Sequence, residues 1–275
     1  MVSLKQLFKP VKSFDEEKAK KFMVENEEGA YTLLDVRQPK EYEQAHIPGA
    51  KFIPLPLLHD KVSELDKEKP VIVYCAIGGR SRVAAQLLSG LGFKEVYNLK
   101  GGIKAWEGIK AAGPQELNLD LITGDESPAD MVMIAYAMEK ASQTFYIKIK
   151  ENSDDQKLIE LLSVLIDVEE KHKKMLQELF LKIESKEKDF KAFEEEILGK
   201  KIMEGGFDME EYMKQNASFL DSVQNLIELA MTLETQSLDL YLRFSEKSKN
   251  KETKDVLLKI AEEEKAHLKS LGNLL

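Results

Sequence analysis

One arrangement of acidic and histidine residues occurs twice in the second half of the chain, and it constrains the fold more than any other feature. A glutamate is followed 30 residues later by the motif Glu-x-x-His, and the second copy lies 95 residues after the first. A glutamate three residues before a histidine lies on the same helix face. The repeat therefore predicts four helices whose glutamate-bearing faces meet. The residues are Glu139, Glu169 and His172 in the first copy, and Glu234, Glu264 and His267 in the second.

These residues lie on the apolar faces of their predicted helices. Leu165 and Val168 flank the first Glu-x-x-His pair, and Ile260 and Leu268 flank the second. A single such pair on a charged helix would be assigned to the solvated surface, but two copies on apolar faces favour a buried site. Buried carboxylates need cations, so the pattern predicts two divalent metal ions. Oxygen ligands with one imidazole per metal favour two iron ions, with manganese as the alternative.

The region that carries the repeat is helical throughout. It is predicted to form a four-helix bundle over residues 127–275, in which one long crossover joins the second helix to the third. The main helices are predicted at 128–152, 155–183, 217–247 and 251–273. The crossover at 184–216 is expected to contain short helices at 189–198 and 209–215.

The first part of the chain has a different hydrophobic pattern. Residues 31–36 and 71–74 are near-continuous apolar runs, typical of strands buried on both faces, and 96–99 forms a further strand. Helical stretches at 15–25 and 81–91 lie between the strands. This alternation predicts an α/β domain with a mainly parallel sheet. We assign this domain to residues 1–107 and a glycine- and proline-bearing linker to 108–126.

The single cysteine of the chain, Cys75, stands where the apolar run 71–74 ends and a helix begins. A thiol at a helix N-terminus is exposed to unpaired N–H groups and to the positive end of the helix dipole, which favour the thiolate. Gly78 and Gly79 allow the backbone to curl around the sulfur, and Arg80 adds a positive charge. The alternative role, a small core side chain, is the commoner one for an isolated cysteine.

Composition excludes several classes of protein. The chain has 275 residues, which favours two domains, and a net charge of −9. Residues 1–112 carry +3 and the remainder −12, so we expect no nucleic-acid partner. One cysteine allows no internal disulfide, no apolar run is long enough for a membrane span, and the basic, mixed N-terminus does not resemble a signal peptide. We therefore expect a cytoplasmic protein that has no membrane partner.

The first domain resembles the rhodanese (sulfurtransferase) family in several motifs that occur in the family's order. Four residues separate Cys75 from Arg80, as in sulfur-transferring members, whereas related phosphatases use a longer loop. The matching segments are LLDVR at 33–37, EY at 41–42, HIPGA at 46–50, CAIGGR at 75–80 and GGIKAW at 101–106.

This resemblance implies that Cys75 and Arg80 are catalytic and that Cys75 carries sulfur as a persulfide. The donor would be thiosulfate, a polysulfide or a persulfide, and the acceptor a thiol. The loop has no basic residue besides Arg80, so thiosulfate is expected to be a poor donor. The sulfur anion would be bound by the loop residues Ala76, Ile77, Gly78, Gly79 and Ser81.

The other charged residues of the rhodanese-like motifs are assigned structural roles. Asp35, Arg37 and Glu41 are expected to form ion pairs and hydrogen bonds. His46 is expected to stabilise its turn, because an ionised thiol needs no catalytic base.

Residues 126–275 resemble the rubrerythrins of the ferritin-like superfamily. The resemblance implies that the six repeated residues bind a di-iron centre, with Glu169 and Glu264 bridging, and that peroxide or dioxygen oxidises its diferrous form. Two departures are visible: Ser237 stands where rubrerythrins commonly have another glutamate, and one cysteine cannot build their rubredoxin module. An external electron-donor protein is therefore expected, and the resemblance allows a homodimer.

Three functions are compatible with these patterns. The leading hypothesis is a bifunctional enzyme that combines a sulfurtransferase with a di-iron peroxide- or oxygen-reducing domain, active under oxidative stress. The alternative is a module that binds or senses persulfides, with the helices as a metal-free dimerisation domain. A storage-type ferritin relative ranks last, because the chain has no evident extra helix for cage assembly.

Overall fold

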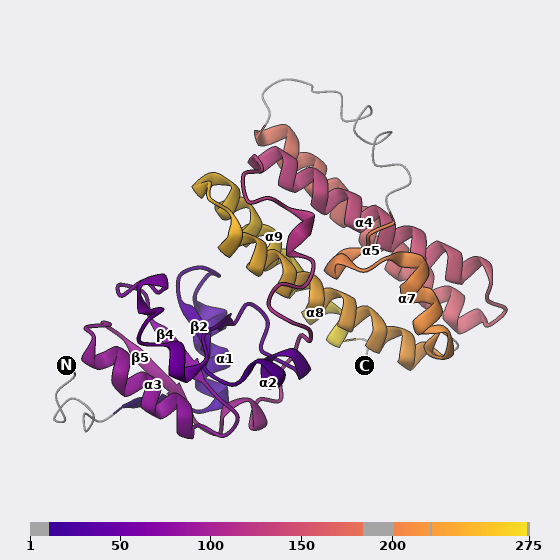
Figure 1. Ribbon diagram of the computed structural model, residues 1–275. Coiled ribbons are helices and arrows are strands. Elements are labelled where there is room, and N and C mark those ends of the chain that lie inside the picture. Colours follow the sequence, from indigo (N-terminus) through magenta and orange to yellow (C-terminus); the bar gives the residue numbers. More distant parts are fainter. Residues whose placement is uncertain (1–10, 184–200, 221, 274–275) are drawn as a thin grey trace. The chain divides into compact units, whose positions relative to one another are not determined.

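The computed structural model describes residues 11–183, 201–220 and 222–273, and the chain divides into two compact units, Met1–Leu117 and Asn118–Leu275 (Figure 1). The division falls inside the predicted linker 108–126. Before it, Ala111 exchanges two backbone hydrogen bonds with His46 of the first unit. After it, Lys247 of the second unit donates to the carbonyl oxygens of Leu119 and Ile122.

The first unit is built on a five-stranded sheet whose pairs are all parallel. Its strands are ordered β1-β5-β4-β2-β3, so β4 lies between β5 and β2. This confirms the predicted α/β fold with a parallel sheet. The strands are β1 (Lys12–Phe14), β2 (Thr32–Asp35), β3 (Lys51–Phe52), β4 (Val71–Tyr74) and β5 (Val96–Leu99).

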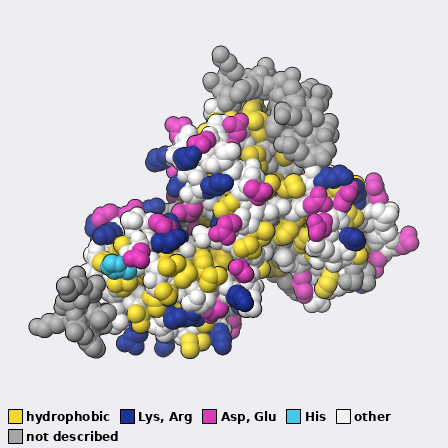
Figure 2. All heavy atoms as spheres, viewed as in Figure 1, with side chains coloured by type: hydrophobic (Ala, Val, Ile, Leu, Met, Phe, Trp, Pro, Cys, Tyr) yellow, Lys and Arg dark blue, Asp and Glu magenta, His cyan; other side chains and the backbone are white. Residues whose placement is uncertain are grey.

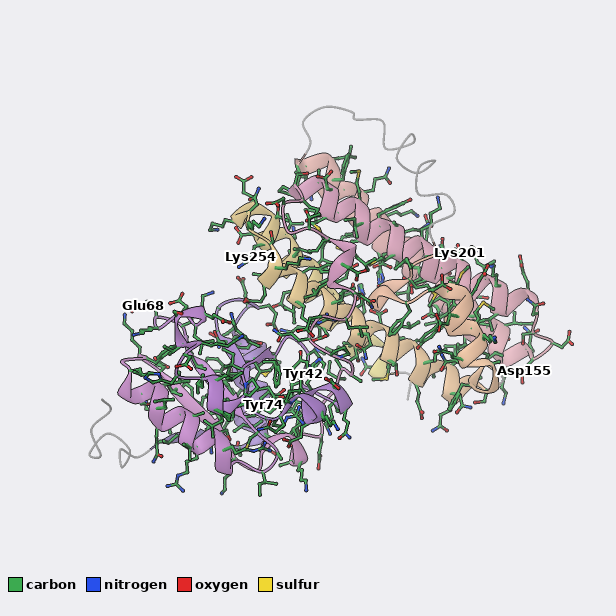
Figure 3. The ribbon with its side chains drawn as sticks, viewed as in Figure 1. Tyr42, Glu68, Tyr74, Asp155, Lys201 and Lys254 are labelled. Atoms are coloured by element: carbon green, nitrogen blue, oxygen red, sulfur yellow. The ribbon has the colours of Figure 1, made fainter. Side chains whose placement is uncertain are left out.

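Alternation along β4 fills the core on both faces of this sheet. Val71 and Val73 pack in one apolar cluster with α3 (Gly79–Gly90), whereas Ile72 and Tyr74 pack in the other. The second cluster includes Tyr42 of α2 (Pro39–Gln44), which Figure 3 shows in the interior of the unit with Tyr74. All four residues of β4 are fully buried, so the apolar run 71–74 has the environment that its sequence predicts.

Local signals determine where the remaining helices begin. The first, α1 (Glu16–Glu25), starts after Asp15, whose carboxylate accepts a hydrogen bond from the Lys18 N–H group. In the second unit α4 (Pro128–Glu151) starts with a capping box between Ser127 and Asp130.

The second unit consists mainly of four long helices, as predicted. The helix α4 packs along α5 (Gln156–Ile183), and α8 (Val223–Lys247) packs along α9 (Lys251–Gly272). The predicted third helix began at 217, but α8 begins at Val223. Residues Ala217–Phe219 form a separate 3-10 turn, and the Ser222 hydroxyl caps α8 by accepting from the Asn225 N–H group.

The crossover contributes structure of its own to the bundle. It holds a 3-10 turn at Glu204–Gly206 and the helix α7 (Met209–Gln215), and α7 coincides with the predicted short helix at 209–215. The predicted helix at 189–198 lies outside the described residues.

Acidic and basic side chains are interspersed over the visible face of both units (Figure 2). Within the ranges that the structure describes, no helix combines the length and the apolar character that a membrane span requires.

Candidate functional site

The thiol of Cys75 lies at the carboxyl end of β4, surrounded by the turn into α3. Gly78 has a left-handed backbone with φ of 95°, and its N–H group donates to Sγ at 3.1 Å. The Ser81 hydroxyl lies 3.4 Å from Sγ and 2.6 Å from Asn98 Oδ1, so it has two acceptors within reach. Of the predicted loop residues, the structure thus brings Ile77, Gly78 and Ser81 to the sulfur, and it adds Asn98 of β5, which bonds Ser81 and which the sequence did not single out.

Hydrogen bonding decides the ionisation of this thiol. Cys75 is 1% exposed, and burial by itself raises a thiol pKa. The Ser81 side chain and the backbone N–H groups of Ser81, Ile77 and Gly78 outweigh burial and lower the pKa of Cys75 below its ordinary value. A buried sulfur with a stabilised anion fits a nucleophile better than a core side chain.

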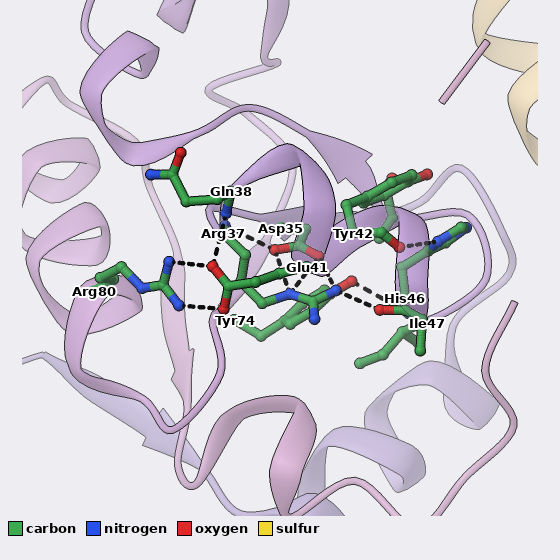
Figure 4. Close-up of polar contacts among 11 residues, drawn as sticks. Asp35, Arg37, Gln38, Glu41, Tyr42, His46, Ile47, Tyr74 and Arg80 are labelled. Carbon is green, nitrogen blue, oxygen red and sulfur yellow. Dashed lines mark hydrogen bonds and ion pairs between the residues drawn. The ribbon is translucent and has the colours of Figure 1, made fainter. Parts of the chain in front are cut away.

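Arg80 forms an ion pair with Glu41 of α2 (Figure 4). Two guanidinium nitrogens donate to the two carboxylate oxygens, each at 2.7 Å. The hydrogen bond from Arg80 lowers the pKa of Glu41 to about 2, and Glu41 in turn raises the pKa of Arg80. The positive charge expected beside the thiolate is therefore shared with a carboxylate, and the Ser81 hydroxyl and the backbone amides of the loop become the main anion-stabilising groups.

The Arg80–Glu41 pair is expected to make part of the stability of the unit depend on pH. The folded pKa of Glu41, about 2, lies below its ordinary value of 4.5, so the pair stabilises the fold above pH 4.5 and is lost as pH falls towards 2. The melting temperature of wild type should exceed that of Glu41→Gln above pH 4.5, and the difference should shrink below it. The control is Glu43→Gln, exposed on the same helix, and an equal pH profile for both variants would contradict the assignment.

Asp35, Arg37 and His46 hold the chain segment that carries Glu41. Arg37 donates to both oxygens of Asp35 and to the Ala45 carbonyl oxygen at 2.6 Å (Figure 4). The His46 ring stacks on Tyr42 at 3.8 Å, with Nδ1 3.0 Å from the Tyr42 carbonyl oxygen. These contacts fit the structural roles expected of the three residues.

The glycine-rich segment 101–106 forms backbone hydrogen bonds with the start of the Cys75 loop. The Ile103 N–H group donates to the carbonyl oxygen of Cys75 at 2.9 Å, and the Lys104 N–H group donates to that of Ala76 at 3.1 Å. A Cβ atom on Gly102 would lie 2.1 Å from the Cys75 carbonyl oxygen, which leaves room only for glycine. The sequence identified this segment only as a motif and did not predict its contact with the Cys75 loop.

In the second unit the six repeated residues meet in the centre of the bundle. His172 Nδ1 lies 3.3 Å from Glu139 Oε2 and 3.4 Å from Glu169 Oε2. The second copy has the same layout, with His267 Nδ1 3.5 Å from an oxygen of Glu234 and 3.5 Å from one of Glu264. The two histidine rings stack with their centroids 3.3 Å apart. The duplicated sequence has thus folded into two matching halves of one cluster.

The chemistry of this cluster fits a pair of divalent cations. Burial and the neighbouring carboxylates raise the pKa of Glu139 and Glu264 well above the usual range, so a cation would replace bound protons. Within the described part of the chain, the Oε2 atoms of Glu169, Glu234 and Glu264 are buried with no hydrogen-bond partner. Buried carboxylate oxygens without donors are the ligands that a hard or borderline metal ion would take up.

A fifth carboxylate in the cluster, Glu204, was missed by the sequence analysis. It is 1% exposed and comes from the 3-10 turn of the crossover. Its carboxylate groups with Glu139 and Glu264, and also with Glu169 and Glu234, with ligand atoms within 4.8 Å of one another. The crossover sequence is rich in glutamate and has no partner in the repeat, so only the adjacent Gly205-Gly206 marks this position.

Comparisons with known proteins find a family match in each of the two units. The model of the rhodanese-like domain matches residues 18–109, and the rubrerythrin model matches residues 175–275. The thiosulfate sulfurtransferase GlpE of Coxiella burnetii is 44% identical over 27% of this chain and 70% of its own length.

Two Bacillus subtilis proteins match the same unit. The uncharacterized protein YqhL is 51% identical over 29% of this chain and 64% of its own length. The putative sulfur carrier protein YrkF is 41% identical over 28% of this chain and 41% of its own length. The chain thus spans less than two thirds of either of these two relatives. By its motifs, its parallel sheet and these matches, the chain belongs to the rhodanese-like family through its first unit and carries a rubrerythrin domain in its second.

Proposed function

We propose that the chain transfers sulfane sulfur through a persulfide on Cys75 and that its helical unit holds a di-iron centre that reduces peroxide or dioxygen. The observation that carries the first activity is the buried thiol whose pKa is lowered by the Ser81 hydroxyl and the loop N–H groups. The relative GlpE, named a thiosulfate sulfurtransferase, supports the same reaction class.

Sulfur transfer would occur in two displacement steps. The Cys75 thiolate attacks the outer sulfur of the donor, the sulfur–sulfur bond of the donor breaks, and the remainder leaves with the electron pair, as sulfite when the donor is thiosulfate. The terminal persulfide sulfur is an anion, which the loop amides stabilise. An acceptor thiolate then attacks that sulfur, forms its own persulfide and regenerates the Cys75 thiolate.

The acceptor must be another molecule. Cys75 is the single cysteine of the chain, so no second thiol of the same subunit can displace the sulfur as a disulfide. Ile77, at the tip of the loop, is 67% exposed, which leaves the approach to the loop open within the first unit. We infer that a low-molecular-weight thiol or a partner protein takes the sulfur.

In the helical unit, Glu139, Glu169 and His172 would hold one metal and Glu234, Glu264 and His267 the other. When bound, the two irons supply the electrons that reduce peroxide or dioxygen, and an external protein restores them. The chain's own residues keep the site in a water-poor interior: Glu139, Glu169 and Glu264 are at most 2% exposed. Iron is favoured over zinc by the predominance of carboxylate ligands.

The sulfur activity is tested by intact-mass measurement of the purified protein after incubation with thiosulfate, polysulfide or glutathione persulfide. We expect a gain of one sulfur atom, mapped to the Cys75 peptide, and its loss when a thiol acceptor is added. Because Arg80 is paired with Glu41, polysulfide or persulfide should load Cys75 faster than thiosulfate. A protein that gains no sulfur from any of the three donors would contradict the proposal.

Metal analysis tests the second activity. Protein purified without oxygen and reconstituted with ferrous iron should hold about two irons per chain, and the double variant Glu169→Gln/Glu264→Gln should hold fewer than one, because the two central carboxylates are lost. The control is Glu170→Gln, with a side chain 44% exposed on α5, which should keep two. Wild-type protein that binds neither iron nor manganese but forms dimers would favour the metal-free dimerisation hypothesis instead.

A further inference from the structure

We propose that Glu204 is a seventh protein ligand of the metal centre, and that metal binding therefore fastens the crossover segment 201–215 onto the bundle. The inference rests on the proposed di-metal centre. It concerns a residue outside the repeated motif, contributed by a segment that has no counterpart in the first copy of the repeat.

The position of the Glu204 carboxylate is the first argument. Its carboxylate forms one group with Glu139 and Glu264 and another with Glu169 and Glu234, so it reaches both halves of the duplicated cluster. Its Oε1 atom is buried with no hydrogen-bond partner among the described residues, and the residue is 1% exposed. A glutamate buried for structural reasons would normally have donors for both oxygens. This carboxylate instead points an unsatisfied oxygen into a cluster of other acids.

Contacts of the surrounding backbone with α4 and α8 hold Glu204 in this position. The Glu204 N–H group donates to Ser142 Oγ at 3.2 Å, one helical turn after Glu139 on α4. On the other side the turn approaches α8 so closely that a Cβ on Gly205 would lie 2.8 Å from Gln236 Cβ. Gly205 has φ of 69°, a left-handed conformation that permits this approach without strain. The turn is thus fitted between α4 and α8 with the carboxylate facing inward.

Two serines occupy matching positions in the two copies of the repeat but have different partners. Ser142 on α4 and Ser237 on α8 each follow a cluster glutamate by three residues. Ser142 accepts a hydrogen bond from the crossover, whereas no described residue of the crossover bonds the buried Ser237 hydroxyl. The crossover therefore breaks the symmetry of the repeat by adding one carboxylate that has no counterpart.

If Glu204 is a ligand, removing its charge should have opposite effects on the metal-free fold and on metal binding. Four carboxylates and two neutral imidazoles balance two divalent cations, and Glu204 adds a fifth negative charge. Without metal, five clustered acids destabilise the fold, so removing one should stabilise it. With metal, the same removal should weaken binding. A purely structural glutamate would give the opposite sign in the metal-free protein.

The test uses the full chain and Mn²⁺, which binds oxygen ligands without redox chemistry. Wild type, Glu204→Gln and the control Glu211→Gln, exposed on α7 of the same crossover, are compared by equilibrium dialysis, thermal unfolding and hydrogen exchange. We expect Glu204→Gln to bind about two Mn²⁺ per chain with affinity about tenfold weaker or more. Its metal-free melting temperature should equal or exceed that of wild type. Mn²⁺ should protect amides of 201–215 in wild type and Glu211→Gln but not in Glu204→Gln.

The outcomes separate this inference from the proposed centre. If wild type binds two Mn²⁺ and Glu204→Gln matches it in affinity and protection, the ligand role is wrong and the di-metal centre stands. If wild type binds no Mn²⁺, both fail. Should Glu204→Gln not fold, Glu204→Asp decides, since it keeps the charge but withdraws the carboxylate by one methylene. Full protection of 201–215 by Mn²⁺ in Glu204→Asp would overturn the inference, and lost protection would support it.

Discussion

Replacing Cys75 with serine is expected to reduce sulfur transfer by at least about a thousandfold, because the hydroxyl cannot carry sulfur as a persulfide and no other thiol exists in the chain. The Gly78 N–H group and the Ser81 hydroxyl, which contact Sγ, can also bond a serine hydroxyl, so a serine should fit without displacing the loop. The measurement is the rate of persulfide formation on a thiol acceptor with polysulfide as donor.

The metal content of the same variant is its internal control. The six repeated residues belong to the other unit, so Cys75→Ser should still bind two metal ions, and Cys75→Ala should give the same pair of results. Sulfur transfer that persists in both variants would mean that the acceptor reacts directly with the donor on another surface. Loss of metal in both would instead indicate that the variants have not folded.

Replacing Gly102 with alanine is expected to destabilise the first unit by roughly 2–4 kcal/mol and to remove most sulfur transfer. Two costs combine at this position. The backbone has φ of 60°, which alanine adopts unfavourably, and the new Cβ would lie 2.1 Å from the Cys75 carbonyl oxygen. Relief of that overlap must push the segment 101–106 away from the loop and break the hydrogen bond from Ile103 to Cys75. Unfolding in denaturant and the transfer rate are measured together.

The matched control is Gly92→Ala. Gly92 also has a left-handed backbone, with φ of 92°, but apart from its chain neighbours no described residue has an atom within 4 Å of the position that its Cβ would take. This variant should lose only the conformational part, about 1–2 kcal/mol, and should transfer sulfur at the wild-type rate when folded. Equal effects from the two substitutions would show that the contact with the loop is unimportant.

Most of the secondary structure could be predicted from the sequence because the periodicity was strong. The fully buried strand β4 appears as an uninterrupted apolar run, and α4, α5 and α9 begin and end within a few residues of their predicted bounds. The edge strands β1 and β3, with three and two residues, are too short to produce a pattern. The predicted start of the third bundle helix was wrong because the Ser222 cap begins α8 later than the apolar pattern suggests.

The residues of the Cys75 loop could be predicted from the sequence, but the charged and polar partners of Arg80 and Ser81 could not. Cys75 and its loop stand together in the sequence, so a strand followed by a glycine turn was enough to find them. The pairing of Arg80 with Glu41 joins residues 39 positions apart, and Ser81 meets Asn98 across 17. No local pattern specifies such contacts, since they depend on how α2, α3 and β5 are placed around the end of β4.

The sequence by itself determined the two units, the place of Cys75 at the end of a buried strand and the six repeated residues, because each depends on periodicity or on spacing along one helix. Only the tertiary structure decided that Arg80 pairs with Glu41, that Gly102 contacts the loop and that Glu204 joins the carboxylate cluster. The physical reason is the same in all three cases. A close contact between distant segments is fixed by the packing of whole elements, and the duplicated acidic motif could predict four helices without revealing what the crossover between them would insert.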